Sequence, residues 1–102
     1  MPESNTQIAT DNPQRLITRL SNHWAHKCPV TRGEGRSEIS LSLGLCQLEA
    51  HGTTLRVRLK GEEDALRQLE TVVANHLQRM ATEPLPEFIW NPSHPDSTRS
   101  NP

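Results

Sequence analysis

The sequence predicts a two-layer α+β sandwich, in which an antiparallel sheet of four to six strands carries two amphipathic helices on one face. Apolar and polar residues alternate over residues 37–43 and 55–60, as in strands with one buried face. Residues 13–27 and 62–80 instead carry apolar residues at helical spacing. Elements that are apolar on one face only must cover one another, so we expect the helices to pack on one side of the sheet.

The N-terminal part predicts a flexible segment, a short strand and the start of a helix. Residues 1–6 are polar and are expected to be flexible, and residues 7–10 are a weak strand candidate. Asp11 is the expected N-cap of the helix, because Gln14 completes a capping box with it and Pro13 suits a first turn.

The first helix is expected to end near Lys27. Pro29 disfavours helical geometry at the residue before it, which sets this limit. The apolar stripe of the helix consists of Leu16, Ile17, Leu20 and Trp24.

The middle of the chain predicts a series of antiparallel strands. A strand is expected to begin at residues 30–31, and the glycines of residues 33–35 predict a turn. Three strands then follow, separated by turns at Gly44 and at residues 51–52. Their inward residues are Ile39, Leu41, Leu43, Cys46, Leu48, Ala50, Leu55, Val57 and Leu59.

The second helix is expected over residues 62–80, with the acidic residues 62–64 in its first turn, where the helix dipole favours negative charge. Two prolines end it, and residues 88–90 predict a last edge strand. Residues 91–102 are rich in proline and lack an apolar anchor, so a disordered tail is expected there. Residues 7–90 are therefore expected to form a single domain.

Composition excludes several classes of protein. The 102-residue chain has a formal net charge of −1 and only three aromatic residues, so it lacks both the basic field and the stacking surface of nucleic-acid binders. No secretory signal and no membrane-spanning apolar run is visible, and we expect a soluble cytoplasmic protein with no membrane partner. The two cysteines are expected to be free thiols, because their spacing fits no disulfide or redox motif.

The side chains best suited to bind a ligand are concentrated at the end of the first helix, where His23 and His26 flank Trp24. Imidazoles three residues apart on a helix can reach a common point, and a divalent metal or iron would need one or two further ligands. Cys46 on the inner face of its strand and His76 on the buried side of the second helix are the candidates. In the alternative interpretation Trp24 and Cys46 are core residues, and His76 is hydrogen-bonded at the edge of the core.

The other candidate motifs in the sequence give weaker evidence of function. Cys28-Pro29 is a dipeptide found in haem-regulated proteins, but a lone pair of this kind occurs easily by chance, so haem is disfavoured. No nucleophile elbow, phosphate-binding glycine loop or paired carboxylate is present, and we do not expect an enzyme.

A row of basic residues on the outer face of the predicted sheet could bind an anion. It consists of Arg56, Arg58 and Lys60. Glu38 and Glu49 lie on the same face and dilute the charge, so the row is interpreted as a solvated surface.

Three segments and a final tryptophan resemble the bacterial family called domain of unknown function 2218. These are His23-Trp24-x-His26-Lys27-x-Pro29-Val30, Gly44-x-Cys46-x-Leu48-Glu49-Ala50, Leu69-Glu70-x-Val72-Val73-Ala74-x-His76-Leu77 and Trp90. The resemblance covers residues 7–90 and implies a small cytoplasmic protein with an accessory role in iron or siderophore handling, in some cases beside a siderophore-interacting reductase. Family members usually have an aromatic residue at the position of Cys28, so the Cys-Pro dipeptide is a departure from the pattern.

The sequence therefore leaves two hypotheses for the function, which belong to different classes. In the first, the chain is a small binding module that holds a metal ion or a ferric chelate at His23 and His26, with Lys27 meeting an anionic group. In the second, it is a structural or interaction module that pairs with another chain, most simply a second copy, through its open sheet face or an edge strand. Convergence of the candidate side chains would favour the first.

Overall fold

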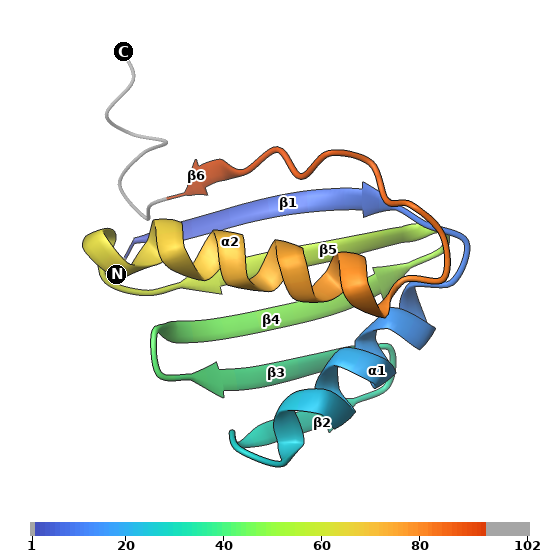
Figure 1. Ribbon diagram of the computed structural model, residues 1–102, viewed down its shortest axis with the longest axis horizontal. Coiled ribbons are helices and arrows are strands. Elements are labelled where there is room, and N and C mark those ends of the chain that lie inside the picture. Colours follow the sequence, from blue (N-terminus) through green and yellow to red (C-terminus); the bar gives the residue numbers. More distant parts are fainter. Residues whose placement is uncertain (1, 94–102) are drawn as a thin grey trace.

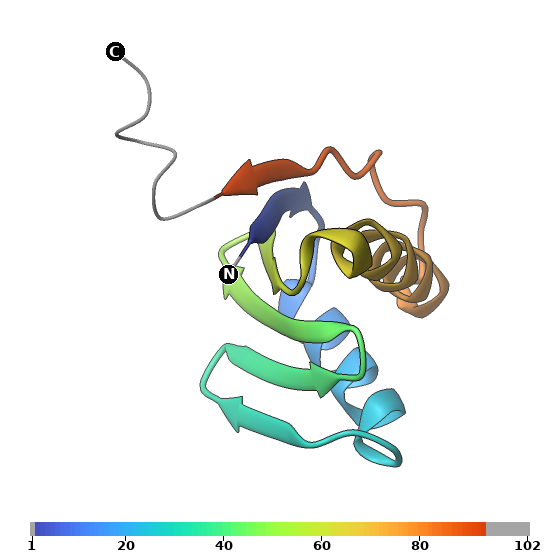
Figure 2. The same ribbon diagram turned by 90° about the vertical axis from the view of Figure 1, so that its left-hand side faces the viewer.

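The computed structural model describes residues 2–93 and confirms the expected α+β class. Six antiparallel strands form one sheet in the order β2-β3-β4-β5-β1-β6, and both helices lie against the same face (Figures 1 and 2). The elements are β1 (Glu3–Ala9), α1 (Pro13–Ala25), β2 (Val30–Gly33), β3 (Arg36–Leu41), β4 (Gly44–His51), β5 (Thr54–Lys60), α2 (Glu63–Met80) and β6 (Asn91–Ser93). None of the helices in residues 2–93 is long and apolar enough to cross a membrane.

The first strand begins at Glu3, inside the segment 1–6 that was expected to be flexible. Ser4 and Thr6 are buried on the inner face of β1, and the Ser4 hydroxyl donates a hydrogen bond of 2.5 Å to Glu70 on α2. A buried hydroxyl must find such a partner. The sequence prediction failed here because the inward residues are polar, which hides the alternation that marks a strand.

Helix α1 has Asn12 as its N-cap, in place of the predicted Asp11. The Asn12 Oδ1 atom accepts a hydrogen bond of 3.1 Å from the Arg15 backbone N–H, which satisfies one of the unpaired donors of the first turn. The helix ends at Ala25, close to the predicted end at Lys27.

The three central strands confirm the predicted alternation. Ile39, Cys46 and Leu59 lie opposite one another on β3, β4 and β5, and none of them is exposed. Leu43, expected to continue the inner face of β3, lies in the turn before β4 and packs partly against the core. The core between sheet and helices also contains Leu16, Ile17, Leu20, Trp24, Leu48, Leu55, Val57, Leu69, Val73 and Leu77.

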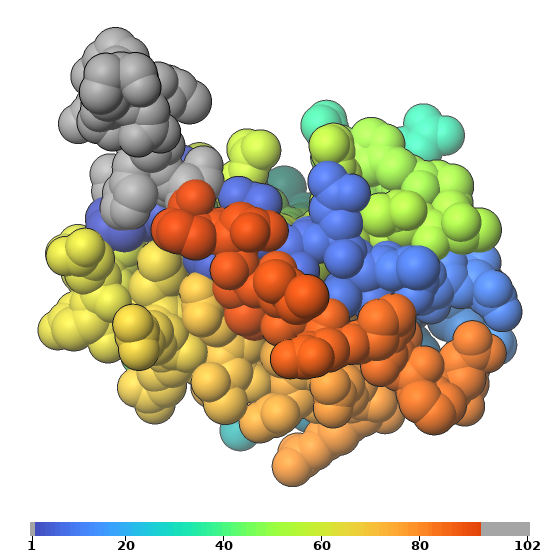
Figure 3. Space-filling view, turned by 90° about the horizontal axis from the view of Figure 1, so that it is seen from above, coloured from blue at the N-terminus to red at the C-terminus, as the bar shows by residue number. Residues whose placement is uncertain are grey.

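The segment after α2 returns along the sheet to form β6. The strand predicted over residues 88–90 lies three residues later, at Asn91–Ser93, where it pairs with residues 3–5 of β1. The predicted disordered tail, residues 91–102, is thus a strand in its first three residues, and residues 94–102 lie outside the described part of the chain. Figure 3 shows the returning segment between α2 and β1. Its aromatic side chains pack against the core, and this anchors the segment before pairing begins.

Candidate functional site

Side chains from the two helices meet at the end of α1. The imidazole centroids of His23 and His76 are 5.2 Å apart, and the Trp24 ring lies 4.8 Å from His76 and 6.2 Å from His23. Trp24 is buried, His76 is half-buried and His23 is exposed. The three rings, which we call the His23–Trp24–His76 cluster, therefore run from the core to the surface.

A backbone contact orients the His76 ring. Its Nδ1 atom lies 2.8 Å from the carbonyl oxygen of Val72, one turn earlier on α2. A carbonyl oxygen only accepts hydrogen bonds, so Nδ1 carries the proton, and in the neutral ring Nε2 keeps a lone pair. The same arrangement, with one ring nitrogen bonded to a backbone carbonyl, orients the imidazole of many metal-ligating histidines.

The other predicted ligands are not part of this cluster. Cys46 is fully buried beneath the helices, and this burial raises the pKa of its thiol from 9.0 to about 12, which disfavours the thiolate that a metal binds. His26 and Lys27 are exposed at and after the C-cap of α1. Across residues 2–93 no three His, Cys, Asp or Glu side chains are grouped so that they could hold a metal ion. The four-ligand set of His23, His26, His76 and Cys46 is therefore not assembled in the described chain.

Two imidazoles fill only part of a coordination shell. Zinc sites in proteins generally use three or four protein ligands, so the remaining positions would fall to solvent or to donor atoms on a ligand. The indole of Trp24 packs beside the two imidazoles from the buried side of the cluster. Chemically the cluster is suited to binding, because imidazole nitrogens are common ligands of transition-metal ions.

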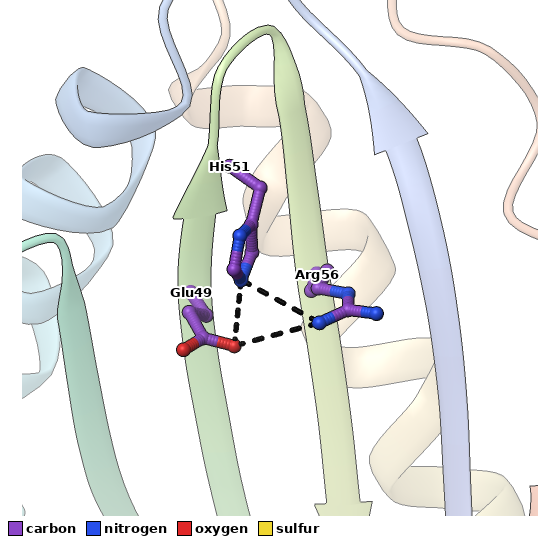
Figure 4. Close-up of polar contacts among 3 residues, drawn as sticks. All are labelled: Glu49, His51 and Arg56. Atoms are coloured by element: carbon purple, nitrogen blue, oxygen red, sulfur yellow. Dashed lines mark hydrogen bonds and ion pairs between the residues drawn. The ribbon is translucent and has the colours of Figure 1, made fainter.

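A second polar group lies on the opposite, outer face of the sheet (Figure 4). His51 Nε2 is 2.9 Å from Glu49 Oε1, and Arg56 Nη1 lies 3.9 Å from the same oxygen and 3.5 Å from the imidazole nitrogen. The hydrogen bond from His51 is the main cause that lowers the pKa of Glu49, and the charges of His51, Arg56 and Arg36 add to it.

Sequence reasoning placed Glu49 and Arg56 on this face, within a row interpreted as a solvated surface, but did not join His51 to them. Arg36, Asn5 and Gln7 also lie around this surface, and none of them was singled out. Their grouping depends on which strands are neighbours and in which register, and neither can be deduced from the alternation within one strand. The only signal available was the outward polar alternation itself.

By its fold, the protein is a small α+β protein whose open antiparallel sheet has one face covered by two helices. The chain belongs to the DUF2218 family, described as an uncharacterized protein conserved in bacteria, whose family model matches residues 5–91. The NMR structure of PA4090 from Pseudomonas aeruginosa is similar, with 35% sequence identity over 89% of this chain and 96% of that chain, and a TM-score of 0.75. Comparison with curated proteins gave no match.

Proposed function

We propose that this protein is a small, non-catalytic binding module whose His23–Trp24–His76 cluster holds a divalent metal ion or an incompletely chelated iron ion. The observation that carries this proposal is the 5.2 Å separation of two imidazoles contributed by different helices. Imidazole nitrogen suits zinc, copper, nickel and iron alike, so the donors by themselves do not select one metal.

The number of donors favours an ion that arrives with other ligands. Two imidazoles leave open positions, and a chelating molecule can fill them. Lys27, exposed just after α1, would contribute positive charge toward an anionic chelate. A siderophore-interacting reductase, suggested by the family resemblance, would be a source of such iron.

The test is ligand-induced stabilisation of the purified protein. Wild type, His23→Ala and His76→Gln are titrated with Zn(II), Ni(II), Fe(II) and ferric citrate while the melting temperature is followed. A ligand that binds only the native state adds about 2.7 kcal/mol at one hundred times its dissociation constant. Wild type should gain several degrees with at least one probe, and both variants should lose most of that gain.

Two further histidine variants serve as controls. His51→Ala removes an exposed imidazole from the outer face and should keep the full gain. His26→Ala decides whether the predicted third histidine takes part, because a loss of the gain would add it to the site. An equal gain in wild type, His23→Ala and His76→Gln, or no gain with any probe, would rule out the cluster as a metal site.

One observation favours the alternative function, an interaction module without a ligand. The outer face of the sheet is covered by none of the helices in residues 2–93 (Figure 2). Light scattering on the purified protein tests its simplest form, a homodimer, since a mass of twice the chain mass at micromolar concentration would support it.

A further inference from the structure

Strand register gathers polar side chains into two rows across the outer face of the sheet. Arg36, Glu49 and Arg56 lie opposite one another on β3, β4 and β5, and Gln7 of β1 continues the row. Residues two positions away along each strand point to the same face, and they form the second row. This row consists of Glu38, Gln47, Arg58 and Asn5.

The two rows surround a hollow of about 550 Å³. This volume lies within the range of about 300–1,000 Å³ that is typical of small-molecule sites. Both signs of charge line the hollow, and arginines outnumber carboxylates. Glu38 and Glu49 lie on β3 and β4 beside Arg36 of β3 and Arg32 of β2, while Arg56 and Arg58 lie on β5. Beside the two arginines are the amide side chains of Asn5, Gln7 and Gln47.

The carboxylates of the hollow already have short contacts. Gln47 donates a hydrogen bond of 3.0 Å to Glu38, and His51 donates one of 2.9 Å to Glu49. These contacts hold both carboxylates on their own side of the hollow.

Among residues 2–93, the polar side-chain contacts of the two arginines of β5 are all long. Arg58 Nε is 4.0 Å from Glu3, and the contacts of Arg56 within the described chain are 3.5 and 3.9 Å. A charge-assisted hydrogen bond from arginine is normally about 2.7–2.9 Å long, and each guanidinium carries five N–H donors. Both side chains are more than half exposed, so exposed contacts of this length contribute little and can give way to a ligand.

We infer that this hollow binds a small oxyanion, a carboxylate or a phosphate, held by Arg56 and Arg58. Asn5, Gln7 and Gln47 donate or accept hydrogen bonds beside it. The site lies on the opposite face of the sheet from the His23–Trp24–His76 cluster, so it is independent of the proposed metal function.

Titration by NMR tests the proposal. Amide resonances of ¹⁵N-labelled wild type are followed in metal-free buffer of low, constant ionic strength as sodium citrate or pyrophosphate is added. Saturable shifts confined to β1, β4 and β5 are expected with at least one probe. The probe that binds more tightly distinguishes a carboxylate from a phosphate ligand, and either result supports the site.

Matched substitutions separate a site from general charge attraction. Arg58→Gln should weaken binding at least tenfold, whereas Arg67→Gln, which removes the same charge from the exposed side of α2, should change it less than twofold. Glu49→Gln should tighten binding several-fold, because it removes negative charge beside Arg56.

Three results would overturn the proposal. They are shifts that never saturate, equal weakening by Arg58→Gln and Arg67→Gln, and a stable dimer in the absence of probe whose interface shifts map to the outer face. The last would mean that a second copy occupies this face.

Discussion

The hydroxyl oxygens of Ser21 and Ser37 lie 2.7 Å apart, in a buried hydrogen bond between α1 and β3. Ser21 lies among the buried residues of its helix and Ser37 points to the inner face of its strand, and both are at most 4% exposed. Each hydroxyl is the partner that the other needs, because a buried polar group without one destabilises the fold.

The stability losses from replacing these two serines should therefore not be additive. We expect Ser21→Ala or Ser37→Ala to lower the free energy of unfolding by about 1–3 kcal/mol, since each leaves a buried hydroxyl unpaired. The double alanine variant should lose less than the sum of the two. Urea denaturation of all four proteins measures the coupling, and strictly additive losses would contradict it.

The buried thiol of Cys46 should make the protein sensitive to alkaline pH. Its pKa is raised to about 12 in the folded state, so from about pH 9 the unfolded chain loses a proton that the folded chain keeps. Stability is complete below pH 9 and should fall by roughly 1.4 kcal/mol per pH unit between pH 9 and pH 12. Denaturation as a function of pH measures this slope.

Cys46→Ala is the control for this dependence. It lowers stability at every pH through the cavity that it leaves, but it should remove the part of the alkaline slope that comes from the thiol. In the native protein a thiol reagent should react with the half-buried Cys28 and spare Cys46. Equal reaction of both thiols would show that the strand opens readily.

Gly44 and Gly52 should respond differently to alanine. At Gly44, φ is +154° and a Cβ atom would lie 2.2 Å from the Lys60 carbonyl oxygen, whereas at Gly52, φ is +60° and the space is open. We expect Gly52→Ala to cost about 1 kcal/mol from backbone strain, and Gly44→Ala to cost clearly more because β4 must also move away from Lys60. Thermal unfolding compares the two, and equal melting temperatures would contradict this reading.

The carboxyl group of Glu49 should titrate below the usual range of glutamate. His51→Ala removes the hydrogen bond that is the main cause, and it should raise the pKa toward its ordinary value. Because the pKa of Glu49 is lower in the folded than in the unfolded protein, its ionised carboxylate stabilises the fold at pH values above the ordinary glutamate pKa. This contribution is lost as the pH falls through the pKa of the folded protein. Side-chain NMR titration measures both proteins; an unchanged pKa in His51→Ala would assign the shift to the arginines.

The sequence determined the elements and the faces they bury. Alternation predicted β3, β4 and β5, and helical spacing predicted α1 and α2, because both patterns record burial along a single element. It also allowed His23 and His76 to approach each other, since His23 flanks the apolar stripe of one helix, His76 lies within that of the other, and both helices were expected on one face of the sheet. Alternation did not find the start of β1, because Ser4 and Thr6 are polar residues buried by virtue of contacts with distant segments.

Only the tertiary structure decided which side chains meet. It left Cys46 fully buried in the core, and it set Arg56 opposite Glu49 on one side and Gln7 on the other. Such neighbours depend on strand order and register, which arise from long-range pairing and not from the local pattern of any one strand. For this protein, the local sequence therefore determines the elements and the faces they bury, and the packing of distant segments determines which side chains share a surface.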